Sequence, residues 1–270
     1  MNDNPLGKRI DVPEKYAPEI LFAVPRSIGR ASLPTIAFSG YDVWNAYEFS
    51  YLDTNGTPVV RRVQIEYPAG SHSIVESKSL KLYLGSFSFE RFSDDEVVAN
   101  IIRKDLAATV GTDDVSVRFF THREQPVMTS FDGAKCVDDV DAVCDEYDYN
   151  PKLLQQIATK NCSGEFISHL LKTNCPITGQ PDWGTVLVRY ESAMGISAAS
   201  LLRYIVSFRR HSGYHEQCCE QIFSDIYQLI EPDALLVACF YTRRGGIDIN
   251  PVRMVGYENE DLRSVHTWRQ

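Results

Sequence analysis

The stretch Ser-Leu-Lys-Leu-Tyr-Leu-Gly-Ser-Phe at residues 79–87 returns as Ser-Leu-Leu-Arg-Tyr-Ile-Val-Ser-Phe at residues 200–208, an offset of 121. Upstream, Thr54-Asn55-Gly56 matches Thr173-Asn174-Cys175 at an offset of 119. Two matches at nearly the same offset predict a tandem repeat with a short insertion or deletion between its copies.

Each half is expected to contain strands, two helices and further strands. In the first half, Ser93 and Glu96 form a predicted capping box, and the apolar stripe that follows predicts a helix ending near Gly111. The other predicted elements are strands at 59–67, 115–121, 185–190 and 234–241 and helices at 78–87, 198–208 and 214–230. Two helices inserted between strands predict an α+β fold with antiparallel sheets and helices on one face.

Composition excludes several classes of protein. The 270 residues carry 27 basic and 36 acidic side chains, a net charge of −9, which argues against a general nucleic-acid binder. The longest apolar run, 234–241, is far shorter than the about 20 residues of a membrane-spanning helix. Residues 1–4 show no secretion signal, and the seven cysteines are an odd number, so we expect reduced thiols in the cytoplasm.

An acidic segment separates the halves. Residues 137–148 contain six acidic side chains and no basic one, and Asn150-Pro151 follows. Because like charges repel at this density, we expect a linker or an exposed crossover. The predicted organisation is an N-terminal module over residues 1–137, an acidic linker over 138–150 and a C-terminal module over 151–270.

The first candidate for chemistry is the segment 173–184, whose prolines and glycines predict a loop of fixed shape around Cys175 and Asp182. A cysteine there is a nucleophile if its pKa is lowered, and Asp182 can exchange a proton. The alternative is a structural cysteine and a turn-capping aspartate. The repeat partner of Cys175 is Gly56, so the repeated fold does not require a cysteine at this position.

Three further candidates are charged. Glu76-Ser77-Lys78 precedes a predicted helix, where Lys78 could meet an anion, and His215-Glu216 begins another. Tyr241 to Gly246 places adjacent arginines and glycines after a strand, which suits phosphate. The alternatives are charged helix ends and an exposed turn. The two halves carry different charged groups at equivalent positions. We therefore expect residues from both halves to form one composite site.

At these residues the sequence resembles a known family. Residues 76–83 (ESKSLKLY) resemble the signature of the NADPH-dependent 7-cyano-7-deazaguanine reductases, the nitrile reductases of queuosine biosynthesis. Residues 170–182, 201–216 and 241–251 resemble the long, two-module form of that family. The resemblance begins near Leu21 and runs almost to the end of the chain.

The resemblance implies two tunnelling-fold modules in tandem, related to GTP cyclohydrolase I but without a metal, in a homodimer. It implies that Cys175 attacks the nitrile to give a thioimide, that Asp182 donates a proton and that NADPH delivers hydride twice, through an imine. The implied substrate-binding residues are Val75, Glu76, Ser77, His215 and Glu216. The implied NADPH-binding residues are Ser77, Lys78, Arg244 and Gly245.

Two other functions remain open on the residues alone. The first is a zinc cyclohydrolase-like enzyme, because the run from His215 to Cys219 comes near a zinc-binding spacing. The adjacent thiols of Cys218 and Cys219 diverge by roughly 100° on a helix, so we expect Cys219 to be core packing. The second is an inactive purine-binding module, against which the presence of both Cys175 and Asp182 argues.

Overall fold

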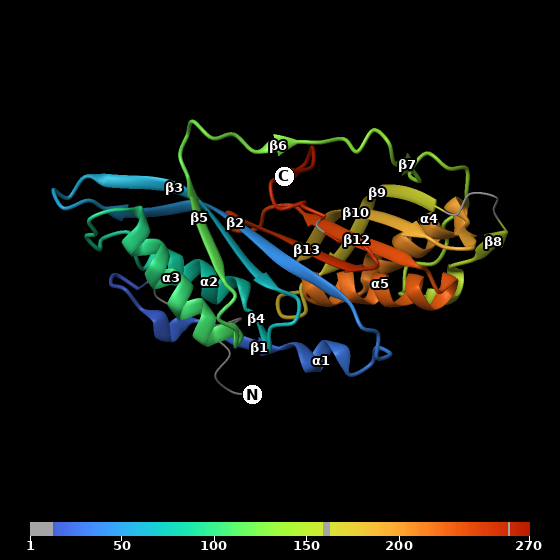
Figure 1. The fold of residues 1–270 in the computed structure, drawn as a ribbon, viewed down its shortest axis with the longest axis horizontal. Coiled ribbons are helices and arrows are strands. Elements are labelled where there is room, and N and C mark those ends of the chain that lie inside the picture. Colours follow the sequence, from blue (N-terminus) through green and yellow to red (C-terminus); the bar gives the residue numbers. More distant parts are fainter. Residues whose placement is uncertain (1–12, 159–162, 259) are drawn as a thin grey trace. The chain divides into compact units, whose positions relative to one another are not determined.

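The computed structural model describes residues 13–158, 163–258 and 260–270 (Figure 1). Residues 1–4 and one of the seven cysteines, Cys162, lie outside these ranges. Largely antiparallel strands are combined with a few helices, which confirms the α+β class. No helix among the described residues is long and apolar enough to span a membrane.

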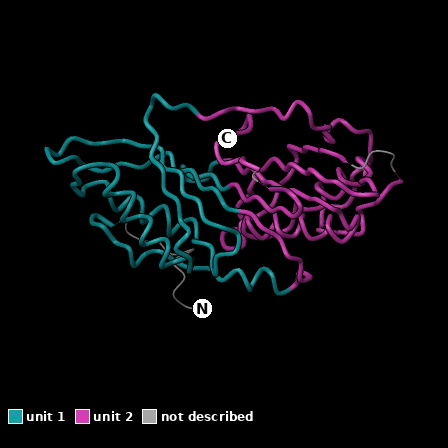
Figure 2. The backbone as a smooth tube through the Cα atoms, in the orientation of Figure 1, with its two compact units in different colours: residues 1–31, 41–125, 243–249 teal, residues 32–40, 126–242, 250–270 magenta. Residues whose placement is uncertain are grey.

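The chain forms two compact units (Figure 2). Unit 1 comprises residues up to 31, residues 41–125 and residues 243–249. Unit 2 comprises residues 32–40, 126–242 and 250–270. Both units are therefore discontinuous in sequence, and the acidic segment 137–148 belongs to unit 2.

Unit 1 is built on an antiparallel hairpin. Its elements are η1 (Pro18–Ile20), β1 (Ala23–Pro25), α1 (Arg26–Arg30), β2 (Ser39–Leu52), β3 (Pro58–Pro68), β4 (Ser73–Val75), α2 (Ser77–Gly85), α3 (Asp95–Val110) and β5 (Ser116–Phe120). The strands run in the order β5-β3-β2, and β1 pairs with β4. Alternate residues such as Val63 and Ile65 on β3 pack against Leu80 of α2 and Ile102 of α3, so both helices cover the same face.

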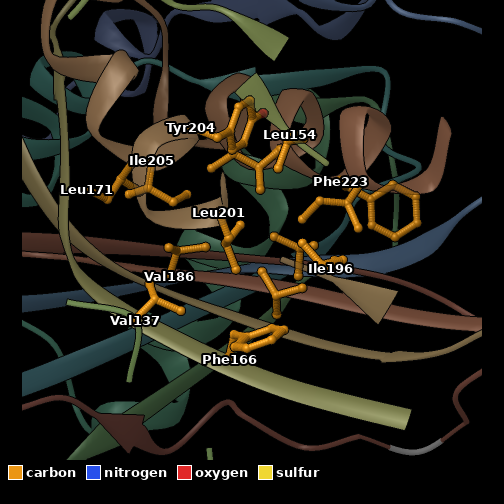
Figure 3. Packing of buried hydrophobic residues seen from close by; sticks show 14 of the residues in the cluster. Val137, Leu154, Phe166, Leu171, Val186, Ile196, Leu201, Tyr204, Ile205 and Phe223 are labelled. Atoms are coloured by element: carbon orange, nitrogen blue, oxygen red, sulfur yellow. The ribbon is translucent and has the colours of Figure 1, made fainter. Parts of the chain in front are cut away.

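Unit 2 has the same order of main elements, with further short strands. Its elements are β6 (Val127–Met128), β7 (Lys135–Cys136), η2 (Pro151–Leu153), β8 (Gln156–Ala158), β9 (Ser163–Asn174), β10 (Pro181–Glu191), β11 (Met194–Ile196), α4 (Ala198–Ser207), η3 (Phe208–Arg210), α5 (His215–Ile230), β12 (Ala234–Tyr241), β13 (Ile247–Val255) and β14 (Val265–His266). The first three residues of β13 belong to unit 1. The strand order is β13-β12-β10-β9-β7, and β8 pairs with β11. Figure 3 shows Val186 of β10, Leu201 and Ile205 of α4 and Phe223 of α5 packed together in the core.

Equivalent hydrogen bonds confirm the predicted internal repeat. The hydroxyl of Ser79 on α2 accepts from the backbone N–H of Phe22, which precedes β1. The hydroxyl of Ser200 on α4 accepts in the same way from the N–H of Gln155, which precedes β8. These two serines begin the repeated stretches, so the sequence match marks a shared anchor between helix and short strand.

A second pair of contacts is repeated further along. Tyr83 of α2 donates its hydroxyl hydrogen to Asp105 of α3 at 2.6 Å, and Tyr204 of α4 donates to Asp225 of α5. In each unit the bond ties the shorter helix to the longer one. The buried tyrosine hydroxyl is satisfied without exposing the core to water.

The start of α3 differs from the prediction. The residue that caps this helix is Asp94, whose carboxylate accepts from the N–H of Val97 at 3.0 Å. Ser93 donates its hydroxyl hydrogen to Asp94 instead of capping the helix itself, so the predicted box of Ser93 and Glu96 is wrong by one residue. The predicted end is confirmed, because Gly111 terminates α3 with a left-handed φ of 73°.

The acidic segment packs along unit 2 in part. Val137 is buried in the core, and Ala142 and Cys144 pack against it, whereas Asp139, Asp141 and Asp145 are exposed. Alternate residues of this extended chain face the core, so several apolar side chains are buried while Asp139, Asp141 and Asp145 stay in water. The predicted module boundaries at 137 and 151 stay a prediction.

Candidate active site

A tight loop holds Cys175 between β9 and β10. The last residue of β9, Asn174, lies opposite the first residue of β10, Pro181. The N–H of Cys175 donates to the carbonyl of Gln180 at 2.8 Å, and the N–H of Gly179 donates back to the carbonyl of Cys175 at 3.0 Å. Gly179 has a φ of 68°, which glycine adopts without strain. The loop is thus closed on itself, and the Cys175 side chain is buried.

Asp182 faces inward at the start of β10. Its neighbours Pro181 and Trp183 are exposed, whereas Asp182 is only 5% exposed, as the alternation of a strand requires. One carboxylate oxygen lies 3.4 Å from Nε2 of His215, the first residue of α5. The structure therefore brings two of the predicted residues, Asp182 and His215, together in unit 2.

The first turn of α5 is buried, not solvated. Gln217 accepts from the N–H of Tyr214 at 3.3 Å as part of a capping box, which fixes where the helix begins. His215 and Glu216 follow and are 6% and 2% exposed. Two ionisable side chains with so little contact with water are unusual at a helix end, which favours a site over a charged surface turn.

Two adjacent cysteines on α5 have different surroundings. Burial raises the pKa of Cys218 to about 12, although Tyr241 and Thr173 lower it through hydrogen bonds. Cys219 contacts the carbonyl oxygens of Val237 and Pro251 through its sulfur, so the expectation that it is core packing is confirmed. Among the described residues, no group of three His, Cys, Asp or Glu side chains could hold a metal ion.

In unit 1, the candidate residues Glu76, Ser77 and Lys78 lie at the start of α2. The Glu76 carboxylate accepts from the N–H of Lys78 at 2.9 Å and from the N–H of Ser79 at 2.8 Å. It is 2% exposed, so it is not the solvated cap that the alternative interpretation would require. The equivalent residue in unit 2, Ser197, caps α4 with a hydroxyl. A hydroxyl is therefore enough to cap this helix, and the carboxylate of Glu76 has a further use.

Arg244 and Gly245 lie in a reverse turn of unit 1. The N–H of Arg244 donates to the carbonyl of Ile247 at 2.9 Å, and Gly245 and Gly246 have φ values of 62° and 78°. The ammonium of Lys81, on α2, donates to the Gly245 carbonyl at 2.5 Å. A Cβ at Gly246 would come within 2.4 Å of the Glu48 carboxyl carbon. The turn thus lies beside the cationic side chains of Lys81 and Arg244, and positive charge fits a phosphate-bearing cofactor.

Comparison with known proteins identifies the family. The model "Nitrile reductase, 7-cyano-7-deazaguanine-reductase N-term" matches residues 12–119, and the model "QueF-like protein" matches residues 181–260. The NADPH-dependent 7-cyano-7-deazaguanine reductase of Bordetella parapertussis is 42% identical over 100% of this chain and 99% of its own. The chain belongs to the NADPH-dependent 7-cyano-7-deazaguanine reductase family.

Members of the reductase family from other organisms match equally well. Those of Desulfotalea psychrophila and Azoarcus sp. are 44% and 45% identical, and the alignments cover 94% and 93% of this chain and 94% and 90% of theirs. A solved structure described as the archaeosine synthase QueF-Like in the apo form aligns at 16% identity with a TM-score of 0.31, covering 39% of this chain and 95% of its own. That similarity supports no conclusion about this member of the reductase family.

In this member of the reductase family, the structure adds one contact and one residue that sequence reasoning did not give. Tyr241, predicted only as the start of the phosphate-binding segment, stacks on His215 with ring centroids 3.8 Å apart. Lys81 follows Lys78 by three residues, a spacing that puts both on one face of a helix and could have drawn attention to it.

Proposed function

We propose that this protein uses NADPH to reduce the nitrile of 7-cyano-7-deazaguanine to the aminomethyl group of 7-aminomethyl-7-deazaguanine, a step in making the tRNA nucleoside queuosine. The names of the full-length relatives support this reaction. The observation that carries the proposal is the closed loop that holds the buried Cys175. The strand β10 follows this loop and places Asp182 3.4 Å from His215.

We assign the nucleophile to Cys175. The thiol first gives its proton to the Asp182 carboxylate. The thiolate then adds to the nitrile carbon, so that a C–S bond forms and one π bond of the C≡N group breaks. The nitrogen takes the proton back from Asp182, which gives a neutral thioimide and restores the carboxylate. A nitrile is a poor hydride acceptor, and conversion to a polarised C=N splits one difficult reduction into easier steps.

His215 and Glu216 are proposed to bind the deazaguanine together with Val75, Glu76 and Ser77. The edge of a guanine-like base offers several N–H donors, and carboxylates accept them well. Glu76 accepts two helix N–H bonds and still has lone pairs for a ligand. Buried groups arranged for this edge reject bases that cannot pair with them, because unpaired polar groups are costly.

Ser77, Lys78, Arg244 and Gly245 are proposed to hold NADPH. When bound, the nicotinamide supplies hydride, and a nitrile needs two such transfers to become an amine. Lys78 and Arg244 provide positive charge for phosphate, and the left-handed φ values of Gly245 and Gly246 shape the turn that carries Arg244. We expect NADH to be used less well, since it lacks the 2′-phosphate.

The same proposal covers the finer architecture. The repeated order of two long strands, a short strand, two helices and a strand supports two tunnelling-fold modules in tandem. We propose modules over residues 1–137 and 151–270, joined by residues 138–150, in a cytoplasmic homodimer without a metal cofactor. No nucleic acid or membrane is proposed as a direct partner.

The direct test is to incubate the purified protein with 7-cyano-7-deazaguanine and NADPH. We expect cofactor oxidation and a product with the mass of the amine, with two NADPH consumed per amine formed. A ratio of one, with an imine or aldehyde as the final product, would contradict the proposal. Equal rates with NADH and NADPH would show that Lys78 and Arg244 do not hold the 2′-phosphate.

A further inference from the structure

Tyr241, the last residue of β12, lies flat against His215 in unit 2. The two rings are 5° from parallel, and their centroids are 3.8 Å apart. Tyr241 is completely buried, and its carbonyl accepts from the side-chain amide of Gln270 at 3.0 Å. The stack therefore joins a rigid central strand to the first residue of α5.

Gly184 makes room for this ring. It lies opposite Tyr241 in the register of β10 and β12. A Cβ at Gly184 would come within 3.2 Å of Cδ1 and 3.4 Å of Cε1 of Tyr241. The closer of these contacts is tighter than an ordinary Cβ contact, so a side chain at residue 184 would require the Tyr241 ring to shift by a few tenths of an ångström.

The stack restricts the imidazole of His215. A histidine ring next to its helix backbone rotates mainly about χ2, whose energy wells are broad. A parallel aromatic ring at van der Waals distance blocks most of that rotation, because any tilt would drive one ring into the other. With the plane fixed, Nε2 of His215 stays 3.4 Å from the Asp182 carboxylate.

We infer that Tyr241 is a positioning residue of this site, whose ring holds His215 in the plane that faces Asp182. It acts through His215 and does not itself touch substrate. The inference rests on the proposed nitrile reduction for its kinetic consequences, but the stack is a property of the ligand-free protein. The requirement is an aromatic face, so phenylalanine should serve and an aliphatic side chain should not.

The kinetic test compares Tyr241→Phe with Tyr241→Leu. We expect Tyr241→Phe to keep kcat/KM within about threefold of the wild type, and Tyr241→Leu to lose about 10- to 100-fold with a raised KM for the nitrile. The KM for NADPH should stay unchanged. Equal losses in both variants would assign the role to the hydroxyl, and wild-type behaviour of Tyr241→Leu would overturn the inference.

A double-mutant cycle separates positioning from general destabilisation. In a His215→Ala background there is no imidazole to hold, so Tyr241→Leu should cause no further loss. A loss by the same factor in both backgrounds would show that Tyr241 acts elsewhere. If Tyr241→Leu does not fold, Gly184→Ala replaces it: the added Cβ should lower kcat/KM by about threefold to tenfold in the wild type and not in His215→Ala.

A spectroscopic measurement tests the stack without substrate. In protein labelled with ¹³C-histidine, protons of the His215 ring lie over an aromatic face and should resonate upfield of the other histidines, the chain having six. His215→Ala identifies the signal. It should remain in Tyr241→Phe, shift in part in Gly184→Ala and move to an ordinary position in Tyr241→Leu. An upfield signal in a protein that reduces no nitrile would refute the proposed function alone, whereas a missing signal would refute the stack.

Discussion

Cysteines of one chain differ in reactivity because their surroundings differ. Cys175 lies in a closed loop that ends one strand and begins the next, whereas burial raises the pKa of Cys218 to about 12 and keeps it as a thiol. Cys136, which is partly exposed, also has a raised pKa owing first to burial. A thiol with a raised pKa is a weak nucleophile at neutral pH, which argues against Cys218 and Cys136 as the nucleophile.

The first prediction is a covalent adduct on Cys175. Incubation with 7-cyano-7-deazaguanine in the absence of NADPH should add one substrate mass to the intact protein, as seen by mass spectrometry. Cys175→Ala should show no added mass, and the matched control Cys136→Ala should keep it. An adduct that survives in Cys175→Ala would place the nucleophile at another residue.

The second prediction concerns proton transfer by Asp182. Asp182→Asn preserves the size of the side chain but cannot release a proton, so kcat should fall by about 10²- to 10⁴-fold. Asp148→Asn is the control, because Asp148 lies on the surface in an ion pair with Arg210. Turnover close to the wild-type value in Asp182→Asn would remove this residue from the mechanism.

The third prediction is a pH effect on stability from His211. Burial lowers its pKa from the usual 6.5, where it packs 5.4 Å from the Tyr149 ring and 5.3 Å from the Phe208 ring. Below pH 6.5 the unfolded chain therefore binds more protons at this residue than the folded chain. Its contribution to the free energy of unfolding is complete above that pH and is lost as the pH falls toward the lowered pKa.

His211→Phe keeps a ring but cannot be protonated. The difference between the urea midpoints at about pH 7.5 and about pH 5 should be smaller in this variant than in the wild type. His122→Phe, at an exposed position, serves as the control and should leave the difference unchanged. An unchanged difference in His211→Phe would mean that other groups account for the acid sensitivity.

At the scale of elements, patterns of side chains predicted the four longest helices and the strands β3, β5, β10 and β12, but not the long strands β2, β9 and β13. The predicted strand 234–241 is β12 itself, and the predicted helix 214–230 differs from α5 by one residue. The three-residue strands β1 and β8 were not predicted, because they are held by pairing with β4 and β11 and are too short to show a period.

The cap of α3 shows where a local pattern is ambiguous. Ser93 and Asp94 are both good capping residues, and each is followed at a suitable distance by acidic or apolar side chains. The choice depends on backbone geometry, which the sequence pattern does not contain. Asp94 is extended, with φ −165°, and so its carboxylate reaches the N–H of Val97.

The fourth prediction follows from this cap. Asp94→Ala should lower the midpoint of thermal unfolding, because the N–H of Val97 loses its acceptor. Ser93→Ala is the matched control and should change the midpoint less, since its hydroxyl contacts only Asp94. The hydrogen bond from Val97 also lowers the pKa of Asp94, so the difference between the variants should shrink as acid protonates that carboxylate. If Ser93→Ala lowered the unfolding midpoint more than Asp94→Ala, Ser93 would be the capping residue, as the sequence predicted.

At the scale of the whole molecule, the repeat was visible in the sequence but the division into units was not. Unit 1 takes in residues 243–249 and unit 2 takes in residues 32–40, contributions that come from distant parts of the chain. Composition along the chain shows only local changes, such as the acidic segment. Pairing between segments distant in sequence therefore determines which residues form each unit. The candidate residues could be predicted individually from the sequence, but the side chains that surround them could not.

The distribution of the candidate residues over the units leads to the last prediction. Glu76 and Lys78 belong to unit 1, and Cys175 and Asp182 belong to unit 2. Because neither repeat carries the full set, Glu76→Ala and Cys175→Ala should each inactivate the protein. If one chain supplies every residue of a site, a mixture of the two inactive variants should stay inactive, and this is the outcome we expect from a tandem fusion.

Recovery on mixing would show instead that two chains complete one site. A mixed dimer of Glu76→Ala and Cys175→Ala would then hold one intact set of residues, provided that subunit exchange has been verified with tagged chains. The control mixture combines Cys175→Ala with Asp182→Asn, whose changes lie in the same unit, so it has no intact set in either arrangement. Activity that returns in the first mixture and not in the control would overturn the single-chain expectation, because only pairing across chains can produce that difference.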